Sequence, residues 1–261
     1  MKQWFMFYQT KPESAWIPMV ASQRNEVIAN LKPPFVTVLD VDHDFDDLGE
    51  APVPLDQRLK CRYKGNLYFD FDSKDIQDAI DDARNFCKEL ADKDVNPDCL
   101  HIFATGGRGF HVEVPLQCVV DRVPAEGIQR QPIINKELAF KLHYDSLDLN
   151  VYSTGRGRMW RTPNVQRPNG RYKVPITYQE LRDMTVEFYE QITAQPRMPV
   201  ERVKPSLAAT LATMWSKASL AVAKTAVKPN KIDHKILEGL DGKWSPSMER
   251  VLTGDLIEPG V

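Results

Sequence analysis

Apolar and polar residues alternate in three short stretches of the chain, residues 67–72, 110–114 and 147–151. Side chains of a strand point alternately to its two faces, so the alternation predicts three strands, each with one apolar and one polar face. The polar positions are Asp70 and Asp72, His111 and Glu113, and Asp148 and Asn150. If the three strands pair in one sheet, carboxylates and a histidine would gather on its open face.

Helical periodicity accounts for much of the remaining chain. It predicts helices over residues 22–31, 73–92, 135–146 and 177–192, and one helix or a pair over 206–227. Ser73 would be the N-cap of the second, and Thr177 opens the fourth with a capping box. Residues 35–41 are typical of a further strand, whereas the proline-containing stretch 115–134 is expected to be a loop. Strands and helices therefore mix along the chain, which predicts an α/β (α+β) fold.

Composition places the chain among ordinary globular proteins. It has 261 residues, of which 42% are hydrophobic and 27% charged, enough for one large domain or two small ones. The net charge of −2 argues against a uniformly basic nucleic-acid-binding surface but permits a local basic patch. Because Pro196, Pro199 and Pro205 mark a linker, we expect a catalytic domain over residues 1–195. Residues 196–261 would then be a helical C-terminal region or a linker to a missing module.

Cysteine spacing and hydropathy predict the compartment. No two cysteines form a Cys-x-x-Cys pair, so we expect reduced thiols and no zinc site. The four are Cys61, Cys87, Cys99 and Cys118. No apolar run approaches the roughly 20 residues that span a bilayer, and the N-terminus lacks a secretory signal. We therefore expect a cytoplasmic protein with no membrane partner.

Two stretches compete as metal sites. Asp70 and Asp72 would lie side by side on one strand face, which is unfavourable unless a cation neutralises them, and Mg²⁺ prefers such oxygen ligands. Residues 40–47 are also acidic, but a calcium loop starting at Asp44 would put Leu48 and Leu55 where oxygen ligands are required. We therefore expect residues 40–47 to be a solvated acidic loop.

Two further segments could bind phosphate. The turn Thr105-Gly-Gly-Arg-Gly109 runs into His111; its glycines permit close backbone approach, and Thr105, Arg108 and His111 offer donors. It is not a Walker A loop, since no Gly-Lys-Ser/Thr follows. Between Asp148 and Glu180 there is no acid, although six cations occur. These are Arg156, Arg158, Arg161, Arg167, Arg171 and Lys173. Taken alone, the turn could be an ordinary hairpin, His111 a core histidine and the basic segment a solvated loop.

Taken in order, these motifs resemble a known signature. The Asp70/Asp72 strand, the turn ending in His111 and the single Asp148 are similar to the three motifs of the archaeo-eukaryotic primase superfamily, in particular the phage- and plasmid-type primases and primase-polymerases. Residues 151–163 and 171–176 also resemble the stretch after the third motif in the family's small catalytic subunits. The resemblance covers about residues 60–190.

The resemblance implies a fold, an activity and partners. The fold would be a primase core with an antiparallel sheet of RNA-recognition-motif type and an N-terminal α/β unit, followed by a small helical C-terminal region. The activity would be nucleotidyl transfer with two Mg²⁺ or Mn²⁺ ions, making a primer or extending a strand. Partners would be a single-stranded DNA template, nucleoside triphosphates and a replicative helicase in the same chain or a separate one. The zinc-binding insertion common in the family is not expected here.

Site residues follow from the same resemblance and from the basic segment. The implied metal ligands and catalytic residues are Asp70, Asp72 and Asp148. The implied triphosphate contacts are Thr105, Arg108, His111 and Arg161. The basic segment adds candidate DNA contacts at Arg156, Arg158, Arg167 and Arg171, because cations beside aromatic residues suit a single strand.

Two other classes of function use the same features. A metal-dependent phosphoesterase or nuclease could use the same three carboxylates, but it need not bind a triphosphate. A non-catalytic module of RNA-recognition type would use sheet aromatics for stacking, and exposed carboxylates on that face would repel phosphates unless a metal intervened.

Overall fold

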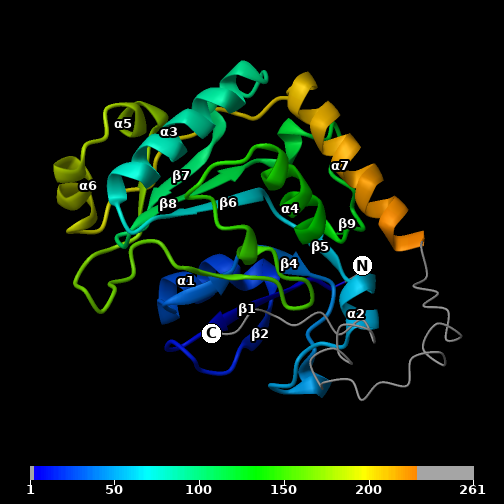
Figure 1. Ribbon diagram of the computed structural model, residues 1–261. Helices are drawn as coiled ribbons and strands as arrows, with labels where there is room; N and C mark the ends of the chain where they lie inside the picture. The colour runs from blue at the N-terminus through cyan, green and yellow to red at the C-terminus, as the bar shows by residue number, and fades with distance from the viewer. Residues whose placement is uncertain (1–2, 228–261) are drawn as a thin grey trace, which may run out of the picture. The chain divides into compact units, whose positions relative to one another are not determined.

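Two antiparallel sheets organise the compact unit Met1–Leu220 of the computed structural model, which describes residues 3–227 (Figure 1). The first sheet follows the order β10-β3-β1-β4-β5-β9, and β2 pairs with β1 outside this path. Its strands are β1 (Phe5–Gln9), β2 (Ile17–Val20), β3 (Phe35–Thr37), β4 (Asp40–Val41), β5 (Arg62–Lys64), β9 (Ile128–Gln129) and β10 (Met159–Arg161). The described chain is therefore a mixed α/β protein, as its pattern predicts.

The second sheet carries the alternating stretches. Its order is β11-β7-β8-β6, and every neighbouring pair is antiparallel. Its strands are β6 (Leu67–Asp72), β7 (His101–Ala104), β8 (Gly109–Val114) and β11 (Val174–Ile176). The strands predicted over residues 67–72 and 110–114 are thus confirmed as β6 and β8.

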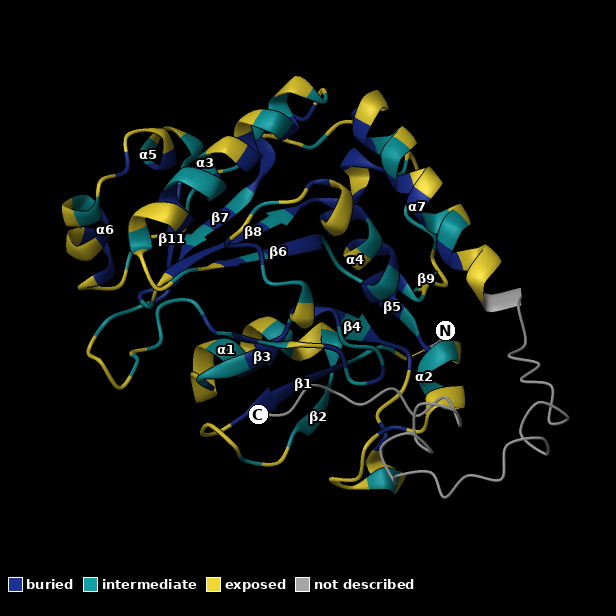
Figure 2. Cartoon of the chain, viewed as in Figure 1, coloured by how far each residue is buried: buried dark blue, intermediate teal, exposed yellow. Residues whose placement is uncertain are grey.

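Helix α3 (Ile76–Asp92) covers one face of this second sheet (Figure 1). Phe86 of α3 packs against Phe69 and Phe71 of β6, with ring centroids 4.6 and 5.1 Å apart. All three side chains are fully buried, and Figure 2 shows β6 and β8 largely in the buried colour. Because the apolar face of β6 is held against α3, Asp70 and Asp72 are turned toward the other face.

The remaining α-helices in the described residues are short apart from α4 and α7. Their bounds are α1 (Arg24–Leu31), α2 (Leu55–Lys60), α4 (Gln131–Lys141), α5 (Tyr178–Arg182), α6 (Val186–Thr193) and α7 (Ala209–Val227). Residues 196–220 belong to the same compact unit as the chain before them. The division into 1–195 and 196–261 stays a prediction, and residues 228–261 lie outside the described residues.

Several predicted elements differ from the observed ones because side chains cap the backbone. The strand over 147–151 is wrong: Leu147 makes a single bridge to Phe71, and the Asp148 side chain then caps the 3₁₀ turn η5 (Leu149–Val151). Asp75, not Ser73, caps α3. The capping box at Thr177 is confirmed, but Thr185 caps a second helix, so residues 177–192 form α5 and α6.

Two other predicted elements have different bounds in the structure. Residues 35–41 form two short strands, β3 and β4, which both pair with β1. Helix α4 begins at Gln131, inside the predicted loop, with Pro132 in its first turn. Proline is tolerated there because the first-turn N–H groups have no partner within the helix.

Candidate active site

Strand pairing places Asp70 beside His111. The β6–β8 register sets Asp70 opposite His111 and Asp72 opposite Gly109, and His111 Nε2 lies 3.3 Å from Asp70 Oδ1. Glycine is required at position 109, because a Cβ there would lie 1.7 Å from the carbonyl oxygen of Phe71. The glycine turn therefore lets β8 approach β6 closely enough to bring the first two motifs together.

Asp148 reaches the same place along the edge of β6. The Asp148 N–H donates to the Asp70 carbonyl at 2.9 Å, and the Asp72 N–H donates to the Ser146 carbonyl at 2.8 Å. Ser146 is in turn held by the Asp82 carboxylate, which accepts from its N–H and its hydroxyl. Two backbone hydrogen bonds thus replace the predicted strand and still set Asp148 next to Asp70.

A pocket of about 310 Å³ joins these residues to β10 of the first sheet. All three predicted metal ligands and all four predicted triphosphate contacts line it. They are Asp70, Asp72, Asp148, Thr105, Arg108, His111 and Arg161, and two predicted DNA contacts, Arg158 and Arg167, line it as well. We call this cavity the carboxylate pocket. Aspartates that could bind metal ions and arginines that could bind an anion therefore line the same pocket.

Asp70 is ionised in this environment. Burial alone would raise its pKa, but the nearby His111, Arg158 and Lys173 outweigh burial, and the pKa of the carboxyl is lowered. The pKa of His111 is also lowered, mainly because the ring is buried and because Lys173 is close. His111 therefore stays neutral at neutral pH while Asp70 carries a charge.

The His111 ring is fixed from two sides. It stacks on Trp160 of β10 with ring centroids 3.8 Å apart and planes 28° from parallel, and Asp70 lies against its Nε2. Among residues 3–227, its buried Nδ1 has no hydrogen-bond partner. One ring nitrogen is therefore left for another group, which is unusual for a buried polar atom.

Lys173, one of the six cations of the basic segment, acts electrostatically on both Asp70 and His111. It is buried, its Nζ lies 4.4 Å from the Phe103 ring centroid and 4.9 Å from that of Trp160, and burial lowers its pKa to about 8. The alternation of side chains along a strand could have indicated this position. The next residue, Val174, begins β11 with its side chain in the core, so the side chain of Lys173 points to the opposite face of the sheet. Lys173 thus supplies positive charge to the buried side of Asp70 and His111.

The basic segment divides into two groups. Arg158 is exposed at the pocket, Arg161 lies over the Phe35 ring at 4.4 Å, and Arg167 donates to the Thr105 carbonyl at 3.0 Å. The pKa of Arg161 is lowered to about 10 by burial and by Arg167. These three side chains come together with the three aspartates.

Arg156 and Arg171 are held elsewhere. Arg156 donates to the carbonyls of Gly49 and Ala51, at 2.6 and 2.9 Å. Arg171 donates to the Glu190 carbonyl at 3.0 Å and also pairs with its carboxylate at 3.4 Å. Their predicted DNA contacts remain predictions, but neither side chain lines the carboxylate pocket.

The donor set of the carboxylate pocket suits a hard divalent cation, because all three candidate ligands offer carboxylate oxygens. Asp72 is half exposed and pairs with Arg108 at 2.9 Å, while Asp148 Oδ1 accepts from the Asn150 N–H at 2.8 Å. In the described chain, the three carboxylates do not converge within 4.8 Å of one another. A bound Mg²⁺ or Mn²⁺ would therefore compete with Arg108 for Asp72.

Comparison with known proteins adds no family assignment. No protein-family model and no curated protein matches the chain. Within residues 3–227, no helix combines the length and hydrophobicity needed to cross a membrane. The carboxylate pocket is therefore the main indication of function.

Proposed function

We propose that this protein is a metal-dependent nucleotidyltransferase, a primase or primase-polymerase of the archaeo-eukaryotic type, acting on single-stranded DNA. One observation carries the proposal: the three aspartates and the four candidate triphosphate contacts line a single pocket of about 310 Å³. The four antiparallel strands, with a helix on one face and polar residues on the other, support the same assignment.

The reaction would join a hydroxyl to a nucleoside triphosphate. A 3′-hydroxyl would lose its proton to water, its oxygen would bond to the α-phosphorus, and the bond from that phosphorus to the bridging oxygen of the leaving pyrophosphate would break. Divalent cations bound by Asp70, Asp72 and Asp148 would stabilise the attacking and leaving oxygens. The low pKa of Asp70 keeps this ligand ionised at neutral pH.

The cations of the pocket would offset the charge of the triphosphate. Arg108 lies in the turn before β8 and Arg161 ends β10 of the other sheet; both line the pocket, so they can act on one bound anion. An anion beside the neutral His111 ring would raise its pKa and favour the imidazolium, which donates from both nitrogens. Four arginines around three carboxylates favour a triphosphate substrate over simple hydrolysis of a phosphate ester.

The template would lie along the exposed side of the pocket. Arg158 is exposed there, and Trp160 and Arg161 follow it in β10. An exposed cation suits the charged backbone of a single strand, whereas Trp160 is 4% exposed and stacks on His111, so its ring is not offered to the bases. A replicative helicase stays a predicted partner.

The proposal is tested by incubating the protein with labelled nucleotides, a single-stranded DNA template and Mn²⁺, with and without a primer. We expect template-dependent strand growth and release of pyrophosphate. Shortening of the DNA without incorporation would instead identify a nuclease. DNA binding without either product would identify a non-catalytic module.

A further inference from the structure

A second group of metal-binding side chains lies where β4 and β5 end. In this pair Asp40 is opposite Lys64 and Val41 is opposite Tyr63. The ladder continues, since the Asp42 N–H donates to the Arg62 carbonyl at 3.1 Å. One further step in the same register sets His43 opposite Cys61.

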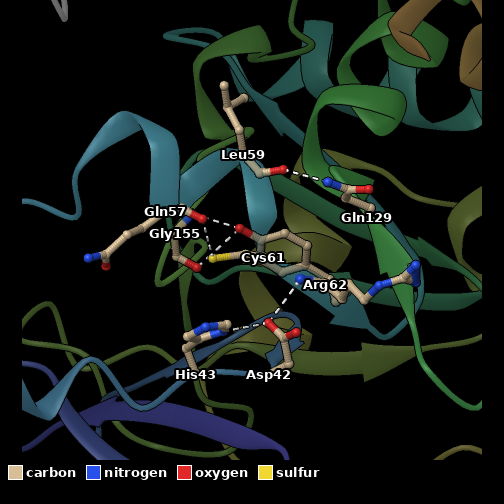
Figure 3. Close-up of polar contacts among 9 residues, drawn as sticks. Asp42, His43, Gln57, Leu59, Cys61, Arg62, Gln129 and Gly155 are labelled. Atoms are coloured by element: carbon tan, nitrogen blue, oxygen red, sulfur yellow. Dashed lines mark hydrogen bonds and ion pairs between the residues drawn. The ribbon is translucent and has the colours of Figure 1, made fainter. Parts of the chain in front are cut away.

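The three side chains lie close together (Figure 3). One ligand atom from each of Asp42, His43 and Cys61 lies within 4.8 Å of the others. We call these three residues the thiolate cluster. Asp42 Oδ1 lies 2.8 Å from His43 Nδ1 and accepts from the Arg62 N–H at 2.9 Å, while the Cys61 thiol donates to the Gln57 carbonyl at 3.2 Å.

The cluster is buried on one side and open on the other. The side chain of Asp42 is 1% exposed and Cys61 is fully buried, whereas the side chain of His43 is 50% exposed. Two ligands are thus held in the protein, and the third reaches solvent. The open side of the cluster is therefore at His43.

We propose that the thiolate cluster binds Zn²⁺. Thiolate, imidazole and carboxylate are the usual protein ligands of zinc, and the sulfur ligand disfavours Mg²⁺ and Ca²⁺. The charges also balance, because Zn²⁺ neutralises one carboxylate and one thiolate with neutral His43. Water would complete the tetrahedron on the exposed side of His43. Binding would release the thiol proton of Cys61 to solvent.

The zinc would fasten a loop that also contacts the segment leading to β10. It would close residues 44–60, and Arg156 donates to carbonyls of this loop at Gly49 and Ala51. The neighbouring Gly155 N–H donates to the Tyr63 hydroxyl at 2.6 Å. Through these contacts the thiolate cluster supports the chain just before Arg158 and Trp160.

The cysteine spacing predicts no zinc site, since that prediction rests on pairs of nearby cysteines. Here the ligands are separated in sequence, between Asp42 and Cys61, and only the pairing of β4 with β5 brings them together. Residues 40–47 do not match the calcium-loop pattern, but two of them, Asp42 and His43, supply two of the three zinc ligands proposed here.

The test is a zinc titration of the full chain against a chromophoric chelator, together with metal analysis of the dialysed protein. We expect about one tightly bound Zn²⁺ per wild-type chain. His43→Ala should weaken binding by at least about 100-fold, since even changes behind a metal ligand cost 10- to 100-fold. Because His43 is half exposed, this variant should keep its fold, which circular dichroism would verify. His143→Ala is the matched control, because His143 is 70% exposed and remote in sequence.

Cobalt gives a second readout. We expect Co²⁺ to produce a thiolate-to-metal charge-transfer band in the wild type and in His143→Ala, and no such band in Cys61→Ala. Zinc binding by His43→Ala that equals the wild type would overturn the proposal. So would a wild-type chain that binds no zinc, and the three residues would then be only a hydrogen-bonded junction. Neither readout depends on nucleotidyl transfer.

Discussion

The carboxylate pocket and the thiolate cluster both place an aspartate next to a histidine, yet their surroundings differ. Asp70 and His111 lie with two further aspartates and four lining arginines, so oxygen ligands and positive charge face one space. Asp42 and His43 lie beside the buried sulfur of Cys61. Ligand type and nearby charge, more than acidity, would therefore separate the proposed site for a hard cation and a phosphate from the proposed zinc site.

The largest effect should come from the carboxylates. Asp70→Asn or Asp148→Asn should lower the rate of nucleotide incorporation by about 1,000-fold, equal to about 4 kcal/mol, because each removes a charged ligand. Primer extension with Mg²⁺ or Mn²⁺ measures this, and circular dichroism checks the fold. Asp145→Asn is the control, since Asp145 is fully exposed and close in sequence. Equal activity of all three variants would remove the pocket from the mechanism.

Arg161 should come next. Arg161→Ala should lower turnover by about 30- to 1,000-fold, because losing one charged contact to the transferring phosphate costs about 2–4 kcal/mol. DNA affinity should change much less than turnover. Steady-state extension and equilibrium DNA binding measured on the same variant separate the two effects. Parallel losses of affinity and turnover would place Arg161 on the template instead.

Lys173 should make the stability of the protein depend on pH. Its pKa is about 8 in the folded protein and 10.5 when unperturbed, so between pH 8 and pH 10 the unfolded chain binds more protons than the folded one. The free energy of unfolding should therefore rise with pH by about 2 kcal/mol from this group. In the variant Lys173→Met, the free energy of unfolding should not show this rise with pH.

Urea unfolding of the wild type and Lys173→Met at pH 8 and pH 10 measures the effect, because other titrating groups cancel in the difference. The same pH dependence in both proteins would mean that Lys173 titrates normally and does not supply buried charge to the pocket.

The smallest effect concerns the template. Arg158→Ala should weaken binding to single-stranded DNA and make its salt dependence shallower by about 0.7 log units per tenfold salt, the value for one phosphate. Arg122→Ala is a matched exposed control that should leave the slope unchanged. An unchanged slope in Arg158→Ala would move the template away from the pocket.

The sequence predicted most of the carboxylate pocket and little of the thiolate cluster, for a physical reason. Strict alternation places Asp70 and His111 correctly, because one buried face fixes the direction of every second side chain. Asp148 is placed by backbone bonds that alternation does not describe. Cys61 meets His43 only through a register set by strands far apart in sequence, and single-sequence patterns carry no such pairing.

By these proposals, the carboxylate pocket holds the triphosphate and its metal, while the thiolate cluster holds zinc. The most direct measurement is diffraction from crystals grown with Mn²⁺, Zn²⁺ and a non-hydrolysable nucleoside triphosphate, recorded at both metal absorption edges. We predict manganese among Asp70, Asp72 and Asp148, with the triphosphate beside it and zinc at Cys61. Manganese and triphosphate bound outside the carboxylate pocket would overturn the proposed function.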